Sequence, residues 1–486
     1  MHDQWGVVSC RTVNRRNWLD AWPAAAIVAT GLLLSTAAVV AAIAALHPKH
    51  GTSSAAVAAT LVIAGAAFLV ACMAMRHPLP RWIWLWVVGV GLLCRLVLLP
   101  APPLHQTDSK RYLWDGLVWI QGQNPWRFSP AQALKGKTVG LPTELHQLAI
   151  RHRRLIQRIN HNHLPTIYPP VSEAVFAAAA WLSPANILSL KGMLLAFDAG
   201  TAVLIALTLR RLKLPRIWLL VYWWNPIVID AFALQAHLDA ITIFFVMLFF
   251  FFLACDRGIP AALALGLAIA AKFWPVVLVL VLARAYIRRP ARLAVILIVT
   301  LVSTLIALAP MLVTGPAAFK SLSAYTDYWQ MNTLVFHLLF RLWRHFTPTW
   351  ESAHMAAIAT ILIIYAGAVP LLLRRADNAR KLIGAGLFLT ALIFLLSPTN
   401  FPWYYTWLVP MLAICPRPSW LLWSCTLGLY HLLFQYPFVV WFEHLPVIIL
   451  LVLELFIPAL SGFLQKVPAA VEANTPSPDI ARSGVA

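Results

Sequence analysis

Long apolar segments alternate with short polar ones along most of the chain. Most of the apolar segments reach the ~20 residues that an α-helix needs to cross the hydrocarbon core of a bilayer. They occupy residues 23–46, 55–75, 82–100, 186–209, 217–233, 239–255, 291–313, 354–373, 382–398, 403–415, 419–436 and 447–463. We therefore predict an all-α polytopic membrane protein.

A further apolar segment, residues 260–283, is interrupted by the sequence KFWP from Lys272 to Pro275. Proline removes a backbone hydrogen bond and clashes with the preceding turn, so a continuous helix is not expected here. A hairpin of two short helices fits the pattern. With it, the predicted total is about 12 to 14 transmembrane helices.

Lys and Arg residues gather in several polar segments, and membrane proteins concentrate these residues in their cytoplasmic loops. The groups are residues 11–16, Arg76 with Arg81, 210–216, 284–292, 374–381 and Arg417. Alternation from a cytoplasmic N-terminus places all of them inside, provided that the broken segment enters and leaves on the same side. The outer face then receives residues 101–170, the QAHLD turn at 235–239, the tip at Lys272, the loop 314–350 and residues 397–407.

This topology divides the chain into five parts. The first apolar run is too long for a signal-peptide core, so we interpret it as a retained span. The polar, proline-containing C-terminal residues have the composition of a disordered segment. The parts are a cytoplasmic N-terminus (1–22), the first three transmembrane helices (23–100), an outer periplasmic or extracellular loop (101–170), a transmembrane core containing the outer loop 314–350 (171–465), and a disordered cytoplasmic tail (466–486).

Composition supports the membrane interpretation, because 61% of the 486 residues are hydrophobic and only 11% are charged. The formal net charge of +20 would also suit a nucleic-acid partner. Bases concentrated in cytoplasmic loops give the same total, so we predict no nucleic-acid partner. The six cysteines are scattered, with neither a C-x-x-C pair nor zinc-like spacing, and are expected to be packing residues.

The predicted outer loop 101–170 holds nine Lys or Arg against three acidic residues. This excess suggests an anionic ligand or lipid headgroup, with solvated bases near phospholipid as the alternative. An amphipathic helix is predicted from Asp108 to Gln121, with Asp108 and Asp115 on one side. Asp108 also stands where an N-cap residue would stand, so a purely structural capping role is the alternative to a functional one.

The second half of this loop places four arginines before His161 and His163. Two histidines at i and i+2 are candidate metal ligands, but no third ligand follows at a fixed spacing, so a hydrogen-bonding role is favoured. The sequence YPP at 168–170 predicts an extended turn. The arginines are Arg151, Arg153, Arg154 and Arg158.

Several motifs in order carry a resemblance to a known family. They are RYLWDG, G-x-NPW, INH-x-x-LPTIYPP, WWNPIVI, a His and Asp pair in AHLDA, AAKFWP and SPTNFPWYYTWLVP. Over about residues 80–430 the chain resembles the GT-C integral-membrane glycosyltransferases, and more narrowly the bacterial branch that uses polyprenyl-phosphate sugars and is often described as mannosyltransferases. Two spans precede the motif-bearing core, whereas many members place the acidic loop directly after the first helix.

The resemblance implies an inverting transfer of a sugar from a lipid phosphate to an acceptor hydroxyl. A carboxylate would accept the hydroxyl proton, a role we assign to Asp108 with Asp115 as a supporting catalytic carboxylate. Positive charge is needed where the phosphate leaves, and a lysine inside an apolar segment suggests such a role for Lys272. Snorkelling towards the interface is the alternative for Lys272. Weaker candidates for the phosphate are Arg151, Arg153, Arg154 and His161.

Aromatic and polar residues complete the predicted binding surface. Tyr168, Trp403 and Tyr404 are expected to contact sugar and lipid, although aromatic residues also form ordinary interfacial belts. His237 and Asp239 match the family's His and Asp pair, with a simple interhelical hydrogen bond as the alternative. We expect the remaining intramembrane carboxylates to pair with neighbouring donors. These are Asp198 and Glu454.

The predicted function is transfer of mannose or a similar hexose or pentose from a polyprenyl-phosphate carrier to a lipid, glycan or protein acceptor. It would occur at the outer face of the cytoplasmic membrane. A secondary transporter or flippase of lipid-linked sugars is the rival, because broken helices and buried charges also occur in transporters. The sequence does not decide whether a divalent metal, Mg²⁺ or Mn²⁺, is required, and Asp115 and Glu173 are the carboxylates that could hold one. The sequence contains no P-loop, G-x-S-x-G or H-E-x-x-H motif.

Overall fold

The computed structural model describes residues 15–47, 53–104, 107–457 and 459–460. Within these residues the chain is helical, and its one β feature is an isolated parallel bridge between Met331 and Thr399. The all-α prediction is therefore confirmed for the described part. The predicted disordered tail, and residues 1–14 of the predicted cytoplasmic N-terminus, lie outside it.

Seven described helices are long and apolar enough to cross a membrane. They are α1 (Arg15–Leu46, apolar from Ala21), α2 (Ser54–Ala74), α9 (Ile187–Arg211), α15 (Pro290–Leu312), α18 (Trp350–Leu373), α19 (Ala379–Leu396) and α22 (Val439–Phe456). An eighth span is obtained if Arg216–Trp223 and Pro226–Leu234, bent by 52°, count as one. The predicted count of 12 to 14 is thus not confirmed by length and composition.

Five shorter apolar helices account for much of the difference between the predicted 12 to 14 spans and the seven or eight long ones. They are α3 (Trp82–Leu98), α8 (Pro170–Leu182), α12 (Asp239–Ala254), α13 (Gly258–Ala271) and Trp274–Tyr286, which joins a 3-10 turn to α14 (Val279–Tyr286). The break between the last two is the one predicted at KFWP. Lys272 has an extended backbone (φ −159°, ψ 140°), and the following proline starts a new helical turn.

Two predicted spans are corrected by the structure. Residues 403–415 form a short 3-10 helix and a four-residue α-helix, and residues 419–436 form a nine-residue α-helix that continues into a six-residue 3-10 helix, so neither is one long α-helix. Pro402, Pro410 and Pro418 occupy the first or second position of three of these helical pieces, as expected for a residue that starts helices better than it continues them. The pieces are Pro402–Trp407, α20 (Val409–Leu412), α21 (Pro418–Thr426) and Leu427–Leu432.

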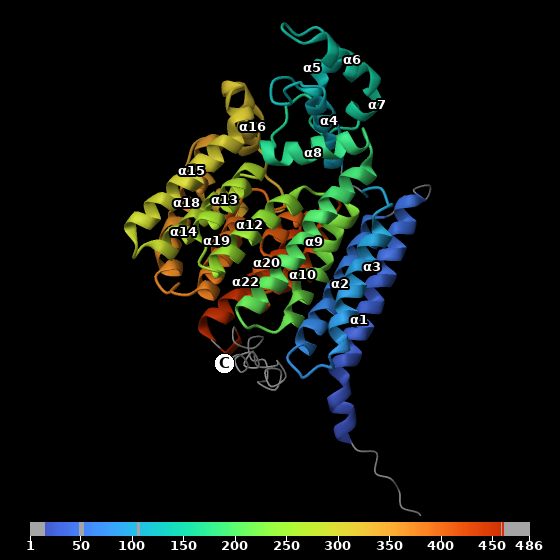
Figure 1. The fold of residues 1–486 in the computed structure, drawn as a ribbon, viewed down its shortest axis with the longest axis vertical. Coiled ribbons are helices and arrows are strands. Elements are labelled where there is room, and N and C mark those ends of the chain that lie inside the picture. Colours follow the sequence, from blue (N-terminus) through green and yellow to red (C-terminus); the bar gives the residue numbers. More distant parts are fainter. Residues whose placement is uncertain (1–14, 48–52, 105–106, 458, 461–486) are drawn as a thin grey trace, which may run out of the picture.

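Residues 107–182, which we call the cap, gather at one end of the helix bundle beside α16 (Lys320–Tyr328) (Figure 1). The cap contains α4 (Asp108–Ile120), α5 (Pro130–Lys135), α6 (Thr143–Arg151), α7 (Arg153–Ile156) and α8. Helix α4 agrees with the predicted amphipathic helix. Gly116 allows α4 and α8 to approach closely, since a Cβ there would lie 2.4 Å from the Phe176 carbonyl oxygen.

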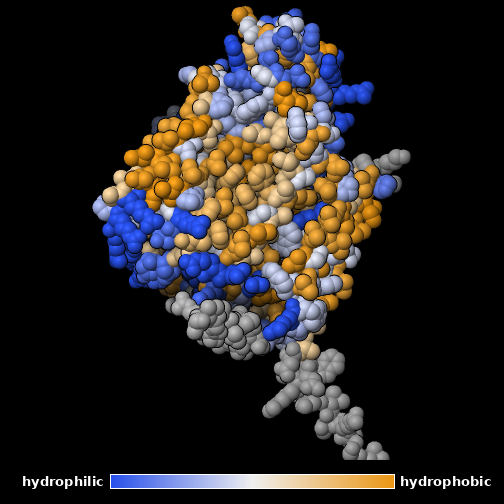
Figure 2. All heavy atoms as spheres, in the orientation of Figure 1, coloured by the Kyte–Doolittle hydropathy of each residue, from blue (hydrophilic) through white to orange (hydrophobic). Residues whose placement is uncertain are grey.

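Hydrophobic side chains cover the middle of the molecule, and hydrophilic side chains gather towards both of its ends (Figure 2). At one end lies the cap, and at the other lie the arginines around residues 284–292 and 374–381. This is the distribution of a protein that meets lipid around its waist and water at two faces. Large exposed side chains such as Ile306 (69%) and Ile363 (72%) belong to the apolar middle.

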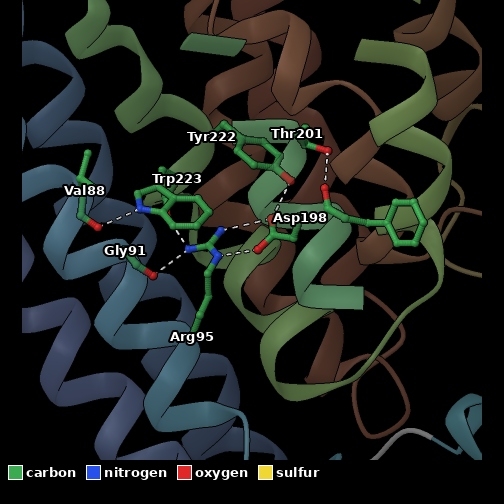
Figure 3. A network of polar contacts seen from close by, with 8 residues as sticks. Val88, Gly91, Arg95, Asp198, Thr201, Tyr222 and Trp223 are labelled. Atoms are coloured by element: carbon green, nitrogen blue, oxygen red, sulfur yellow. Dashed lines mark hydrogen bonds and ion pairs between the residues drawn. The ribbon is translucent and has the colours of Figure 1, made fainter. Parts of the chain in front are cut away.

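A buried ion pair ties the first helices to the core (Figure 3). The Arg95 guanidinium of α3 pairs with the Asp198 carboxylate of α9 and lies 3.5 Å from the centroid of the Trp223 ring in α10 (Leu220–Trp223). Nearer the start of α9, Lys191 Nζ donates to the carbonyl oxygens of Leu98 and Ala101 at 2.6 Å each. These contacts fix the end of α3, from which the chain runs to the cap.

Candidate active site

A cavity of about 700 Å³ lies between the cap and the ends of the membrane helices. Its walls come from the start of α4, the loop 160–169, α16 and residues 397–407, which are far apart in sequence. Seven of the residues predicted as site residues line it. They are Asp108, His161, Tyr168, Asp239, Lys272, Trp403 and Tyr404.

Asp108 is the first residue of α4, and its carboxylate is directed to the cavity rather than to the helix end. The N-cap position is Thr107, and no side-chain capping bond is formed there, so the capping alternative is wrong. The Asp108 side chain is 31% exposed, and its Oδ2 lies 3.8 Å from His237 Nδ1. Burial raises the pKa of Asp108 to about 6, against the opposing effect of the Lys272 charge.

His237 lies beneath Asp108 and is 1% exposed. Its ring stacks on Trp403 with centroids 4.0 Å apart, and neither ring nitrogen has a hydrogen-bond partner within the described protein. The backbone leading to it is irregular: a π-helix spans Ile229–Leu234, and Ala236 has φ +61°. Such strained backbone is often found at functional sites.

Lys272 is held by a carboxylate and two aromatic rings. Its Nζ lies 2.7 Å from Asp239 Oδ1 and 4.3 Å from the centroid of the Tyr404 ring. Trp407 Nε1 donates to the same Asp239 oxygen. Lys272 is 19% exposed and faces this group, so the structure does not place it as a snorkelling residue. Lys272 follows the last residue of α13, and its backbone is extended.

Three predicted site residues lie away from the cavity. Asp115, in the middle of α4, is 1% exposed and sits between α4 and α8. Arg151 and Arg154 are exposed on the surface of the cap, in α6 and α7. The structure therefore does not bring these three groups together with Asp108.

Arg111 is a cavity residue that the sequence analysis missed. It follows Asp108 by three positions, a spacing that puts both residues on the same side of α4. Its Nη2 donates to the His161 carbonyl oxygen at 3.0 Å, whereas its buried Nη1 has no partner within the described protein. The helical spacing from Asp108 was the signal that could have revealed it.

Aromatic residues from the loop after α15 also reach the cavity and were not predicted. Tyr325 of α16 shares a hydrogen bond of 3.1 Å with the Tyr404 hydroxyl, and the Trp329 ring lies 4.6 Å from that of His161. The predicted topology put the loop 314–350 on the same face as the cap. However, no sequence motif in this loop distinguishes Tyr325 or Trp329 as site residues.

Metal ligands are not clustered in the described part of the chain: no three His, Cys, Asp or Glu side chains there are arranged to hold an ion. His161 and His163 have ring centroids 6.0 Å apart in an edge-to-face arrangement. Glu173 lies beside Asp115 rather than in the cavity wall.

No curated protein and no solved structure matches the chain at a significant level. A protein-family model does match, over residues 166–398, which include Tyr168, His237, Asp239 and Lys272 but not Asp108. The resemblance to the GT-C class is thereby confirmed, while the particular branch stays a prediction. The matched family is glycosyltransferase family 87, a family of membrane glycosyltransferases in the GT-C-like class, and residues 166–398 of the chain are similar to it.

Proposed function

We propose that the protein transfers a sugar, mannose or a similar hexose or pentose, from a polyprenyl-phosphate carrier to a hydroxyl of a lipid, glycan or protein acceptor. The observation that carries this proposal is the position of Asp108. Its carboxylate enters a 700 Å³ cavity that also receives a lysine, an arginine and a group of aromatic rings. A general base, cationic groups and a partly apolar wall are what this reaction requires.

Asp108 is the proposed base. The acceptor hydroxyl gives its proton to the Asp108 carboxylate while its oxygen forms a bond to the anomeric carbon. On the opposite side of that carbon the bond to the phosphate oxygen breaks, and the lipid phosphate leaves with the electron pair. Displacement from the opposite side inverts the anomeric configuration. With a pKa of about 6, Asp108 is ionised at neutral pH yet more basic than an ordinary aspartate.

Lys272 and Arg111 are the proposed partners of the departing phosphate. Both line the cavity on the walls near Asp108, and the charge of each lowers the pKa of Asp108. The Lys272 charge is already balanced by Asp239, whereas Arg111 Nη1 has no hydrogen-bond partner in the part of the chain that the structure describes. Fixed cations in a site shielded from bulk water stabilise negative charge better than they do in solution.

Aromatic residues form the proposed surface for the sugar and the start of the lipid chain. The Phe401 and Trp403 rings stack with centroids 4.4 Å apart, and Tyr404 stacks on Trp407 at 4.5 Å. Leu164, Ile167 and Phe434 add apolar surface to the same cavity. Such a wall suits an isoprenoid chain, which is apolar along its whole length.

We place the cavity at the outer face of the cytoplasmic membrane and count the short apolar helices α3, α12, α13 and α14 among the spans. The support is the group of bases at the end opposite the cap. A cysteine at Val139, which is 97% exposed on the cap, should react with a membrane-impermeant thiol reagent in intact cells. A cysteine at Asp377, 55% exposed at the other end, should react only after permeabilisation. The reverse pattern would overturn this orientation.

Reconstitution into vesicles tests the reaction itself. The wild-type protein is expected to transfer sugar from at least one member of a panel of polyprenyl-phosphate hexoses and pentoses, and not from the corresponding sugar nucleotides. A parallel series with a chelator determines whether a divalent metal is required. Transfer from nucleotides alone would overturn the proposed donor. Movement of a lipid-linked sugar across the bilayer without transfer would favour a flippase instead.

A further inference from the structure

A second cavity, of about 480 Å³, lies at the end of the bundle opposite the cap, where α13 and α15 both begin. It shares no residue with the candidate active site. One wall is formed by residues 257–260, and the other comes from the first turns of α15. The residues of this second wall are Ala291, Arg292, Val295 and Ile296. Arginine and aliphatic side chains thus line the same space.

The two helices touch along glycines of α13. A Cβ on Gly258 would lie 2.5 Å from Ile296 Cδ1, and a Cβ on Gly266 would lie 2.1 Å from Ser303 Oγ. The contacts advance along both helices together, so α13 and α15 run in the same direction from the same end. The arginines of the cavity stand at the two helix starts and therefore lie at one level of the bundle.

The cavity opens towards the side of the bundle that faces lipid. Ile259 and Val295 line it and are 53% and 50% exposed. Helix α15 is one of the long helices that are apolar enough to cross a membrane, and Val302, seven residues after Val295, is 46% exposed on it. The aliphatic part of the cavity is thus continuous with the apolar surface of the protein.

The arginines around the cavity outnumber the carboxylates. Arg292 Nη2 donates to the Asp256 carbonyl oxygen at 2.9 Å, and its guanidinium lies 4.8 Å from the centroid of the Tyr286 ring. The Asp256 carboxylate is shared between Arg292, at 3.7 Å, and Arg289, at 3.9 Å. Arg257 is exposed and forms no side-chain hydrogen bond or ion pair with the described residues. One carboxylate therefore faces three arginines.

The position of these charges indicates the kind of anion that they fit. Arg289 and Arg292 stand at the start of a membrane-crossing helix, which is the level of lipid headgroups, and the aliphatic wall continues from there towards the hydrocarbon. A soluble anion would use the arginines and leave the aliphatic wall exposed. A phospholipid would use both, since its phosphate and its acyl chains are joined in one molecule.

We infer that this cavity binds an anionic phospholipid, whose phosphate contacts Arg257 and Arg292 and one of whose acyl chains lies against Ile259 and Val295. Arg292 is held in place by Asp256 and Tyr286, whereas Arg257 is free to close on the headgroup. The inference is independent of the proposed function, because it uses no residue of the candidate active site.

Thermal unfolding of the purified full-length protein in detergent tests the charge requirement. Phosphatidylglycerol and phosphatidylcholine with the same acyl chains are titrated, and the lipid concentration needed for a given rise in unfolding temperature is compared. Phosphatidylglycerol should act at a lower concentration. Arg257→Gln should raise that concentration about fivefold, the effect of one basic residue beside an anionic lipid, and Arg292→Gln in addition should bring the total to at least about tenfold.

Matched controls separate this site from general attraction to the basic end. Arg375→Gln, at an exposed arginine of the same end outside the cavity, should change the phosphatidylglycerol concentration less than about twofold. Val295→Trp fills the cavity without changing its charge and should weaken the lipid effect about fivefold or more. Val302→Trp, at a similarly exposed position of α15, should not. Without lipid, Arg257→Gln should unfold at the wild-type temperature, because its side chain contacts no described partner.

Three results would overturn the inference. They are equal effects of phosphatidylglycerol and phosphatidylcholine on the wild type, equal losses from Arg257→Gln and Arg375→Gln, and a normal lipid response of folded Val295→Trp. Glycerol 3-phosphate, which has the headgroup phosphate but no acyl chain, should not stabilise the protein at the same concentrations. Stabilisation by it would identify a site for a soluble anion instead.

Discussion

Two ion pairs between a Lys or Arg and a buried carboxylate lie among the apolar helices of the described residues, and they differ in what surrounds them. Arg95 and Asp198 are 3% and 0% exposed and every charged atom has a partner. Lys272 and Asp239 are 19% and 1% exposed and face the cavity. A basic residue paired with an aspartate thus occurs once in a sealed network and once at an open site.

The sealed network is complete in itself (Figure 3). The Asp198 carboxylate accepts from Arg95 and from the Tyr222 hydroxyl, the latter at 2.6 Å. Arg95 Nη1 donates to the carbonyl oxygens of Gly91 and Trp223 at 3.0 and 2.9 Å. Among the described residues every charged atom of Arg95 and Asp198 already has a protein partner, so the network joins helices.

The open pair lies near polar groups that lack hydrogen-bond partners within the described residues. They are the two ring nitrogens of His237 and the Nη1 of Arg111, and the Asp108 carboxylate nearby is partly exposed. A charged residue in a membrane helix is therefore a weak sign of function when taken alone. Unsatisfied polar atoms beside a cavity are the stronger sign, since a substrate can supply their missing partners.

Breaking the sealed pair should have the largest effect on stability. Arg95→Met leaves Asp198 buried without its cation, and loss of one member of such a pair costs roughly 3–5 kcal/mol. The double variant Arg95→Met, Asp198→Leu should recover most of this loss, because neither charge remains. Thermal unfolding in detergent measures both effects. Transfer activity per folded molecule should stay near that of the wild type, and a specific loss of activity would assign the pair a role in the reaction.

Breaking the open pair should affect donor binding more than folding. Lys272→Met removes a cation from the cavity, and we expect the apparent donor affinity to fall about tenfold. Adding Asp239→Asn restores charge balance, so the double variant should regain any lost stability without regaining affinity. Steady-state kinetics with varied donor measure the change. An unaltered KM for the donor in Lys272→Met would move the phosphate site elsewhere.

The pH dependence of kcat/KM should reveal the base of the open site. Asp108 must be ionised to accept a proton, and burial raises its pKa to about 6 from an ordinary value near 4. Activity should therefore be level above about pH 7 and fall about tenfold per pH unit below 6. Asp115→Asn should keep this inflection. Its disappearance in that variant would assign the titration to Asp115.

The sequence predicted the site better than the helix count. Asp108, Lys272, Asp239 and Trp403 stand out because charged or aromatic residues next to apolar segments are conspicuous, and all four line the cavity. Alternation of spans correctly grouped the segments that form it. Length alone failed for residues 403–415, because prolines divide this apolar run into short helical pieces whose side chains are mostly buried.

Other features depend on packing that a sequence pattern does not specify. Asp115 and Asp108 are seven positions apart on one helix, yet one faces α8 and the other the cavity. Arg151 and Arg154 are as basic as Arg111, and only contact with the loop 160–169 distinguishes Arg111 from them. The sequence predicted that Asp198 and Glu454 would pair with neighbouring donors, and both do. Glu454 Oε1, for example, accepts from the Ser419 backbone N–H at 2.7 Å. Their identities required the fold.

Asp108→Asn tests the central claim most directly. The variant and the wild type are reconstituted at equal amounts of folded protein, and sugar transfer from the active polyprenyl-phosphate donor is measured at pH 7.5. A general base contributes about 10²- to 10⁴-fold, so the variant should lose at least about 100-fold in turnover while keeping its thermal stability and its binding of polyprenyl phosphate. Near-normal turnover by folded Asp108→Asn protein would contradict the assignment of Asp108 as the base.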